Sequence, residues 1–287
     1  MIFVPWLCFA VNWATLSLRS HRSALDGSRD LNLPLSEDQL SRLENLADLV
    51  VEWNDRINLV SRKDCNPETV WERHILPSVA ICATENPLQS ASTVVDVGTG
   101  GGFPGLPLAI AYPEAEFLLL DSVGKKLTAV QDMAESLGLS NVQIHHGRAE
   151  ELRGRRFDVA TGRSVSALPQ FCAWMHHLMQ PETGRLMYWI GGEIEESVLS
   201  RVQIDIPVEE LVTSLETDKR VLILSQSSVS EIADESGITV TLPNPPKKQR
   251  PARTKKPDKA KGSWQRRRGD ENETKQRGYD NFQRYSS

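Results

Sequence analysis

A glycine-rich segment contains the residues best suited to bind a ligand. It reads Asp96-Val97-Gly98-Thr99-Gly100-Gly101-Gly102-Phe103-Pro104-Gly105 and links an apolar run at 93–97 to another at 104–111. Glycines let a ligand approach the backbone closely, and α/β proteins bind ligands at loops that join a strand to a helix. Gly100, Gly102 and Gly105 also match the dinucleotide-binding spacing, although this short motif alone is a weak signal.

Three further positions narrow the class of ligand. Asp96 ends the first expected strand, where an acid is unfavourable beside a phosphate but suits a ligand with a cationic amino-acid group. Asp121 ends the next expected strand and, with Ser122, is placed to bind ribose hydroxyls. Ala149-Glu150 follows a third strand, at the place for an adenine ring. Together they favour S-adenosylmethionine, and capping of a loop or helix is the alternative role for the two aspartates.

Other kinds of chemistry have little support in the sequence. The four cysteines are scattered and include no CxxC pair, so we expect neither a disulfide framework nor a zinc site and assign no metal. Cys172 and His176 would share a helix face, but no further ligand lies near them in the sequence. A serine hydrolase would need a GxSxG turn, which the chain does not contain.

Alternating strands and helices are expected to position the glycine-rich segment. Short apolar runs predict strands, and the periodic segments between them predict helices. The expected strands are 93–97, 116–121, 142–146, 157–161, 185–190 and 221–226, and the expected helices are 104–111, 125–137, 167–179 and 193–200. This alternation is typical of a doubly wound α/β fold with parallel strands.

A helical section is expected before the sheet. Ser36 and Gln39 form a capping-box pattern, and apolar residues then recur at helical spacing. A second helix should begin at Asn66-Pro67 and bend or stop at Pro77. We therefore expect an N-terminal helical extension over residues 31–92, followed by the ligand-binding domain over residues 93–243.

Charge is distributed unevenly along the 287 residues. Residues 247–287 contain seven lysines and seven arginines against five acidic residues, a net charge of +9, whereas the rest of the chain carries −14. Residues 244–287 are rich in proline and charged residues and nearly empty of aliphatic ones, so we expect a disordered basic tail. Residues 1–30 begin with an uncharged stretch and are expected to form a leader or a disordered N-terminus. The composition excludes collagen-like and polytopic membrane proteins.

The glycine-rich segment and its surroundings resemble the GidB/RsmG family of small-subunit rRNA guanine-N7 methyltransferases. The matching stretches are 96–126, 53–59, 73–76 and 157–168, and the resemblance spans roughly residues 36–226. It implies a class I methyltransferase-like α/β fold with a doubly wound, mostly parallel, seven-stranded sheet and an N-terminal helical extension. It also implies S-adenosylmethionine as the cofactor and a guanine in the decoding-region loop of 16S-type rRNA as the methyl acceptor.

The resemblance adds site residues to those inferred from the residues alone. The family's cofactor contacts carry over to Gly98, Phe103, Ala149, Glu150 and Arg163, which join Asp96, Gly100, Gly102, Asp121 and Ser122. His74, Lys125 and Arg148 match basic family positions that face RNA or the site, with a solvated surface charge, or for His74 a buried imidazole, as the alternative role. Guanine N7 has a free lone pair, so in-line placement is sufficient and we assign no general base.

The sequence departs from the family at three places. Gly162-Arg163-Ser164 stands for the usual Ser-Arg-Ala, and Pro77 stands for a usual Asp. Trp189-Ile190-Gly191-Gly192 replaces a Lys-Gly that would lie near the substrate. The missing lysine keeps open a noncatalytic ribosome-assembly factor on the same fold, and the spacing of Gly100, Gly102 and Gly105 keeps open an NAD(P)-dependent oxidoreductase.

The expected partner is small-subunit rRNA or a ribosomal particle. The basic tail and the uncharged N-terminal stretch favour an organelle, a plastid before a mitochondrion, over the cytoplasm. We expect a monomer without stable membrane association.

Overall fold

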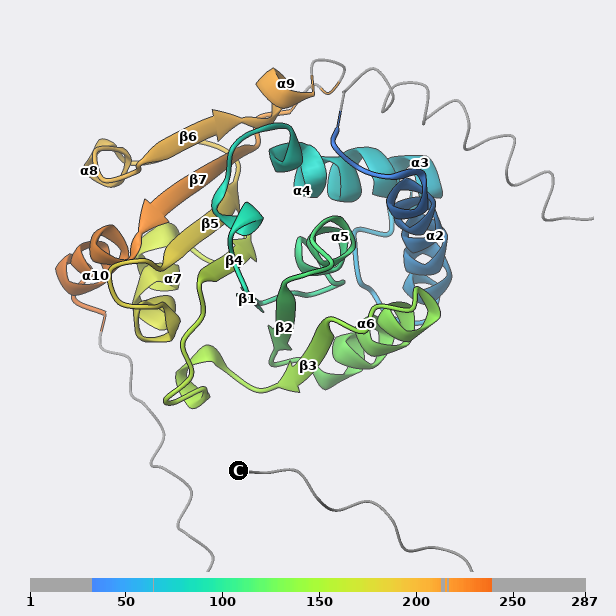
Figure 1. Ribbon diagram of the computed structural model, residues 1–287, viewed down its shortest axis with the longest axis horizontal. Helices are drawn as coiled ribbons and strands as arrows, with labels where there is room; N and C mark the ends of the chain where they lie inside the picture. The colour runs from blue at the N-terminus through green and yellow to red at the C-terminus, as the bar shows by residue number, and fades with distance from the viewer. Residues whose placement is uncertain (1–32, 64, 213–214, 216, 239–287) are drawn as a thin grey trace, which may run out of the picture. The chain divides into compact units, whose positions relative to one another are not determined.

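A seven-stranded sheet lies at the centre of the fold (Figure 1). The computed structural model describes residues 33–63, 65–212, 215 and 217–238, so the expected leader and basic tail lie outside the described residues. The strands are β1 (Thr93–Val97), β2 (Glu116–Asp121), β3 (Val142–His146), β4 (Val159–Arg163), β5 (Arg185–Ile190), β6 (Ile204–Pro207) and β7 (Arg220–Ser225).

The order of the strands is β3-β2-β1-β4-β5-β7-β6. The first five strands in this order are parallel, and β7 is antiparallel to both β5 and β6. The chain runs outward from β1 to β3 and then crosses to β4 on the other side of β1. This reversal places a ligand-binding crevice at the carboxyl ends of β1 and β4. The predicted class I methyltransferase fold, with its mostly parallel sheet, is confirmed.

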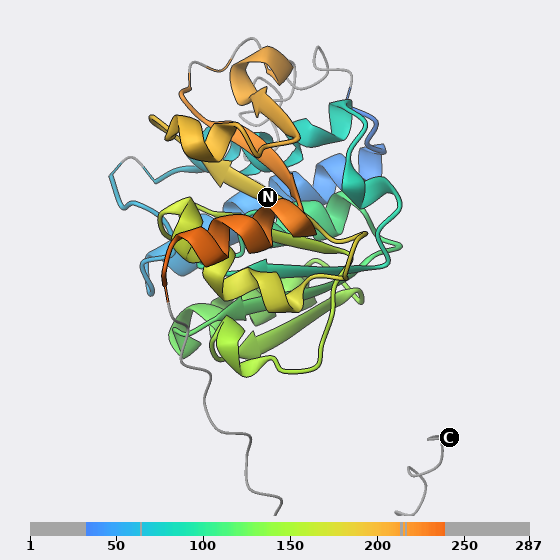
Figure 2. The same cartoon turned by 90° about the vertical axis from the view of Figure 1, so that its left-hand side faces the viewer.

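Helices cover both faces of the sheet. They are α2 (Glu37–Asn54), α3 (Pro67–Val70), η1 (Trp71–Ile75), α4 (Leu76–Val79), η2 (Ala80–Ala83), η3 (Pro87–Gln89), α5 (Gly105–Ala111), α6 (Gly124–Ser136), η4 (Ala149–Glu151), α7 (Leu168–Met175), η5 (His176–Leu178), α8 (Glu196–Leu199), α9 (Val208–Leu211) and α10 (Gln226–Glu235). Alternate strand residues enter two separate cores, with Val94 in one and Val95 in the other. Figure 2 shows α7 and α10 in front of the sheet and α2 behind it.

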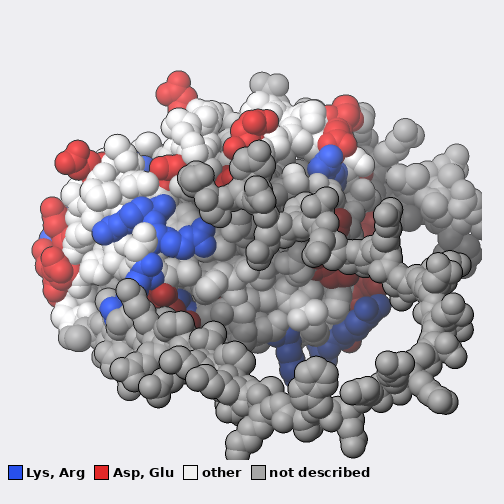
Figure 3. All heavy atoms as spheres, turned by 60° about the horizontal axis from the view of Figure 1, so that its bottom comes forward, with Lys and Arg blue, Asp and Glu red and all other residues white. Residues whose placement is uncertain are grey.

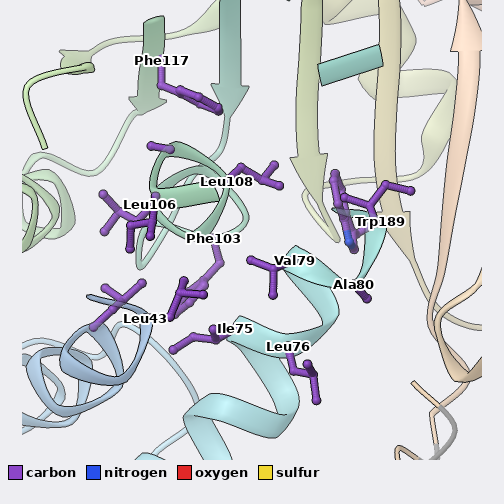
Figure 4. Close-up of a cluster of buried hydrophobic side chains, with 14 of the residues drawn as sticks. Leu43, Ile75, Leu76, Val79, Ala80, Phe103, Leu106, Leu108, Phe117 and Trp189 are labelled. Carbon is purple, nitrogen blue, oxygen red and sulfur yellow. The ribbon is translucent and has the colours of Figure 1, made fainter. Parts of the chain in front are cut away.

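The helices before β1 share a core with one face of the sheet. Leu43 of α2, Ile75 of η1 and Phe103 of the glycine-rich loop belong to the same buried cluster (Figure 4). The predicted capping box at Ser36 and Gln39 is present. The Gln39 amide also donates to the carbonyls of Ile110 and Ala111 at 2.9 and 3.0 Å, so it caps the end of α5 as well. The extension therefore packs as a layer of the same fold.

The helix after Asn66 was predicted to bend or stop at Pro77, and it does not stop there. Helical backbone continues through η1 and α4 to Val79, and η1 is a π-helix that ends at Ile75, two residues before Pro77. Proline has no N–H to donate, and the wider turn accommodates it without ending the helix. Pro77 O accepts a 2.8 Å hydrogen bond from the indole of Trp189 on β5. Two of the departures from the family are thus in direct contact, and Figure 4 shows Trp189 beside Val79 and Ala80.

Three elements of the last third of the chain were missed by the sequence patterns. These are β6, α9 and α10. β6 is a short edge strand with exposed residues and Pro207 at its end, so it lacks the apolar run of a buried strand. α10 is rich in serine, and its Ser225 cap was the available signal. β4 begins at Val159, two residues later than predicted.

Candidate functional site

A cavity of about 240 Å³ opens at the carboxyl ends of β1 and β2. Its walls come from the glycine-rich loop, the ends of two strands, η4 and α7. The lining residues are Val97, Gly98, Gly100, Leu120, Asp121, Ser122, Lys126, Gly147, Arg148, Ala149, Glu150, Val165 and Trp174. Six predicted cofactor positions are among them: Gly98, Gly100, Asp121, Ser122, Ala149 and Glu150.

Hydrogen bonds from β2 fix the glycine-rich loop against this cavity. The N–H of Gly98 donates to Leu120 O at 2.9 Å, and the N–H of Gly100 donates to Asp121 Oδ2 at 2.9 Å. Asp121 Oδ1 accepts from the N–H of Val123 at 2.8 Å. Each carboxylate oxygen has a second lone pair, so Asp121 can hold the loop and still accept a hydrogen bond from a hydroxyl group of a ligand.

Gly98 allows no side chain at its position. Its φ is +69°, and an added Cβ would lie 2.7 Å from Val165 Cγ1, a cavity wall. The left-handed conformation and the close contact both require glycine. Loop and cavity therefore depend on this residue.

The donor set of the cavity fits S-adenosylmethionine. Leu120, Val165 and Trp174 offer apolar and aromatic surface that could hold a planar base, and the Asp121 carboxylate could accept hydrogen bonds from ribose hydroxyls. Val165 and Trp174 were not predicted. The sequence indicates these two residues only through their position after β4, the strand across the crevice from β2.

Asp96 has a different place from the one expected. Its side chain is fully buried, with no exposed surface, and lies on the α5 face of β1 rather than in the cavity. Asp96 Oδ2 accepts from the N–H of Gly105 at 3.1 Å, and Oδ1 accepts from the Thr161 hydroxyl at 3.0 Å. Burial raises the pKa of Asp96 to about 6, although these hydrogen bonds and Arg163 oppose the rise. It holds the loop against β4 instead of contacting a cationic ligand group.

Three other predicted residues form a second group, outside the cavity lining. Phe103 is 3% exposed, and its ring centroid lies 5.2 Å from that of His74. The Arg163 guanidinium lies over Phe103 at 4.9 Å from the ring centroid and donates to His74 O at 3.4 Å. Gly102, also predicted, is buried, and an added Cβ would lie 2.5 Å from Leu106 Cδ1. The loop thus lines the cavity with its first glycines and contacts this second group through Phe103.

The second group is strongly cationic. Burial lowers the pKa of His74 to about 3, and the charges of Arg163, Lys219 and Arg73 lower it further in the same direction. His74 is therefore neutral at pH 7. Burial also lowers the pKa of Arg163 to about 10, while Asp96 opposes this shift. Lys219, which the sequence did not single out, belongs to the same group.

Arg148 and Lys125, the other basic residues predicted to face RNA or the site, differ in their position relative to the cavity. Arg148 is exposed at the rim of the cavity, whereas Lys125 is exposed and does not line it. Lys126 lines the cavity instead, because α6 begins at Gly124 and turns Lys126 inward. Figure 3 shows basic side chains gathered in patches on one face.

The described residues contain neither a metal-binding cluster nor a helix that could span a membrane. No cluster of three or more His, Cys, Asp or Glu side chains there could hold a metal ion. No described helix is both long and apolar enough to cross a membrane.

Comparison with known proteins identifies the family. The family described as GidB, rRNA small subunit methyltransferase G, matches residues 39–220. Ribosomal RNA small subunit methyltransferase G of Chlorobaculum tepidum is 43% identical over 177 residues, 60% of this chain and 80% of the relative. The protein of the same name from Chlorobium limicola is 40% identical over 185 residues, 63% of this chain and 82% of the relative.

Solved structures are more distant. The mitomycin 7-O-methyltransferase MmcR is 15% identical, with a TM-score of 0.44 and 75% of each chain covered. The family match and the two relatives from Chlorobaculum tepidum and Chlorobium limicola show that the chain belongs to the GidB family of S-adenosylmethionine-dependent rRNA small-subunit methyltransferases.

Proposed function

We propose that the protein transfers a methyl group to N7 of a guanine in the decoding-region loop of 16S-type rRNA, by direct in-line displacement and without a general base. Membership of the GidB family makes the protein an rRNA guanine-N7 methyltransferase that uses S-adenosylmethionine. The loop within the RNA, the contacting residues and the mechanism are the parts that we propose.

The observation that carries the proposal is the cavity between the glycine-rich loop and Asp121. Gly98 and Gly100 bring bare backbone to its wall, and Ala149 closes it at the end of β3. Each of these residues lies at a carboxyl end of a parallel strand, the edge at which doubly wound proteins bind ligands. The NAD(P)-dependent alternative fails because the chain belongs to a methyltransferase family.

The protein has to position and shield the reactants. When bound, S-adenosylmethionine supplies a methyl group already activated by its sulfonium. The Asp121 carboxylate would orient the ribose, and Val165 and Trp174 would exclude water from one side. Holding two reactants in line lowers the activation barrier, by about 7–11 kcal/mol in the best intramolecular reactions.

The site residues support a reaction without a general base. His74 has a pKa of about 3, so its ring is a poor proton acceptor. Both oxygens of Asp96 already accept hydrogen bonds from the protein, and its side chain is buried. Guanine N7 carries a lone pair and needs no deprotonation, so neither group is required as a base.

The first test is calorimetric titration of S-adenosylhomocysteine into the full chain, its Gly98→Ala variant and a matched Gly138→Ala variant. Gly138 has a φ of +66°, and an added Cβ would meet nothing within 4 Å. Both variants should lose about 1 kcal/mol of stability from the left-handed backbone. Only Gly98→Ala should also lose affinity, by roughly tenfold or more, because its Cβ displaces Val165.

Equal affinity of the two variants would refute the proposed cofactor site. A second measurement is N7-methylguanine mapping in small-subunit RNA incubated with the wild-type protein. Methylation in the decoding-region loop is expected. Cofactor binding without methylation of any such RNA would instead support the noncatalytic assembly factor.

We also propose that the protein acts in an organelle, a plastid before a mitochondrion. The support is the uncharged start of residues 1–30 and the basic tail, both outside the described residues. Microscopy of the full chain fused at its C-terminus to a fluorescent protein tests this location.

A further inference from the structure

Two cations are bound to consecutive carbonyl groups beside the glycine-rich loop. Arg163, at the end of β4, donates to His74 O at 3.4 Å. Lys219, directly before β7, donates from Nζ to Arg73 O at 2.9 Å. Arg73 itself carries an exposed side chain on η1. Three separate elements thus bring three cationic side chains to one place.

None of these cations forms an ion pair with a described carboxylate, although the charges of Asp96 and Asp218 act on Arg163 and Lys219 from a longer distance. Arg73, Arg163 and Lys219 form no ion pair with another described residue, whereas Arg42, Arg56, Arg201 and Arg220 do. Asp218 is next to Lys219 in the chain, but its carboxylate accepts the N–H of Gly192 at 3.0 Å. Burial lowers the pKa of Lys219 to about 8, with Arg163 and Arg73 adding to this and Asp218 opposing it. Such a group of like charges is costly to a fold unless an anion binds there.

A second observation also indicates a polar ligand. Nδ1 of His74 is buried and has no hydrogen-bond partner among the described residues. Its ring packs against Phe103, the residue that also carries the Arg163 guanidinium. Buried nitrogen atoms in folded proteins are normally bonded to protein, water or ligand. The unpaired atom therefore lies within the same cationic group.

The position of Lys219 follows from the antiparallel ladder. Ile190, the last residue of β5, pairs with Arg220, so Lys219 lies just past the end of β5, opposite Gly191. Strand β5 itself ends in Trp189 and Ile190, which carry no charge. The positive charge at this part of the sheet edge is consequently supplied by the neighbouring strand, β7.

We propose that Lys219, with Arg163 and Arg73, binds a backbone phosphate of the RNA substrate next to the methylated guanine. This inference rests on the proposed function. The glycine-rich loop has the cofactor cavity at Gly98 and Gly100 and the cationic group at Phe103, so a substrate bound to these cations lies across the loop from the cofactor. A phosphodiester is the anion that an RNA substrate brings, and a planar guanidinium with an ammonium is suited to bind it.

The test compares the full-length wild type with Lys219→Gln, Lys219→Arg and Arg185→Gln. Arg185 lies at the opposite end of β5, and its guanidinium binds carbonyls of a surface turn, so its variant controls for loss of one positive charge. For each protein we would measure the affinity for unmethylated small-subunit RNA across a salt series, the affinity for S-adenosylhomocysteine, and the melting temperature.

Lys219→Gln should bind RNA about tenfold more weakly at low salt, and the slope of log affinity against log salt should fall in magnitude by about 0.7. Lys219→Arg should retain most of the RNA affinity because it keeps the charge. Affinity for S-adenosylhomocysteine should stay within about twofold in all variants. The Arg185→Gln control should keep the wild-type slope.

Three results from the variants would overturn the inference. An unchanged slope of log RNA affinity against log salt in Lys219→Gln would show that Lys219 does not bind the RNA. A loss of S-adenosylhomocysteine affinity would assign the cation to the carboxylate of the cofactor. Equal losses in the Gln and Arg variants, with a lowered melting temperature, would make Lys219 a support for the Arg73 carbonyl. Failure of the wild type itself to methylate RNA would overturn the proposed function, and this inference with it.

Discussion

Single residues at the glycine-rich loop divide into ligand contacts and supports. Asp121 is the last residue of β2 and Asp96 the second-last of β1, yet Asp121 lines the cavity and Asp96 is buried under the loop. The difference follows from the alternation of strand side chains, because Asp96 shares its face of β1 with Val94, which packs into the core beneath α5. A carboxylate at a strand end therefore needs its face determined before a role is assigned.

The titration of His74 gives a prediction at this scale. Its pKa is about 6.5 in the unfolded chain and about 3 in the fold, so below pH 6.5 the unfolded state binds a proton that the folded state does not. This residue's contribution to stability is complete above pH 6.5 and is lost as the pH falls toward 3. His74→Gln should therefore lose less stability on acidification than the wild type, as measured by urea unfolding at a series of pH values.

The matched variant for this comparison is His146→Gln. His146 is exposed and has its ring beside Ser122 O. A change in acid dependence as large as that of His74→Gln would show that the effect does not depend on the burial of His74. Parallel curves for the wild type and His74→Gln would show that the ring accepts a proton in the folded state.

The sequence located the cavity residues better than the second group. Glycine spacing and strand ends are local signals, and they led to Gly100, Asp121 and Ala149, which line the cavity. Phe103 and Arg163 were expected at the cofactor but lie in the cationic group. Lys219 was missed, because a single lysine in a polar connection has no pattern and acquires its neighbours only through the pairing of β7 with β5.

At the scale of elements, the buried parallel strands were the easiest to predict. β1, β2 and β5 have the predicted bounds because strands covered on both faces form nearly continuous apolar runs. β3 also has its predicted bounds, although it is an edge strand whose residues are partly buried or exposed. β6 lies at the sheet edge with two exposed residues and lacks such a run. The behaviour of the helix at Pro77 depended on a π-turn and on a contact with β5, neither of which is encoded locally.

The contact between β5 and α4 gives a prediction for stability. Trp189 is 1% exposed and donates its indole N–H to Pro77 O. Trp189→Phe removes this buried hydrogen bond and leaves unfilled space, so it should cost about 1–3 kcal/mol in chemical denaturation. The matched control is Trp53→Phe, since Trp53 donates to Asp132 Oδ2 at the surface, at the same distance of 2.8 Å. A cost for Trp189→Phe no larger than that of the control would show that the contact does not hold the two elements together.

At the scale of the whole molecule, charge is separated along the chain. Residues 1–246 carry −14, although the substrate is a polyanion, and residues 247–287 carry +9. The sequence gives this separation completely because it is a matter of composition. The sequence does not show where the basic side chains of the described residues gather, since Arg163 and Lys219 are far apart in the chain.

Removal of residues 247–287 should weaken binding to small-subunit RNA and reduce its dependence on salt. The loss of the tail's positive charges leaves fewer counterions to release from the RNA. Affinity for S-adenosylhomocysteine should not change. A variant whose tail has the same composition in shuffled order should bind RNA like the wild type. If the truncated and wild-type proteins showed the same salt dependence, the tail would have no electrostatic part in RNA binding.

The glycine-rich loop is shared by the two proposed sites, with Gly98 and Gly100 at the cavity and Phe103 under the Arg163 guanidinium. Any change in loop conformation on binding one reactant is therefore felt by the other. Thermodynamic linkage then requires reciprocity: the factor by which bound RNA changes the affinity for the methyl donor equals the factor by which the donor changes the affinity for RNA. A loop that couples the sites in this way would let the enzyme favour the complete ternary complex, and after transfer the same linkage would govern the order in which the two products leave.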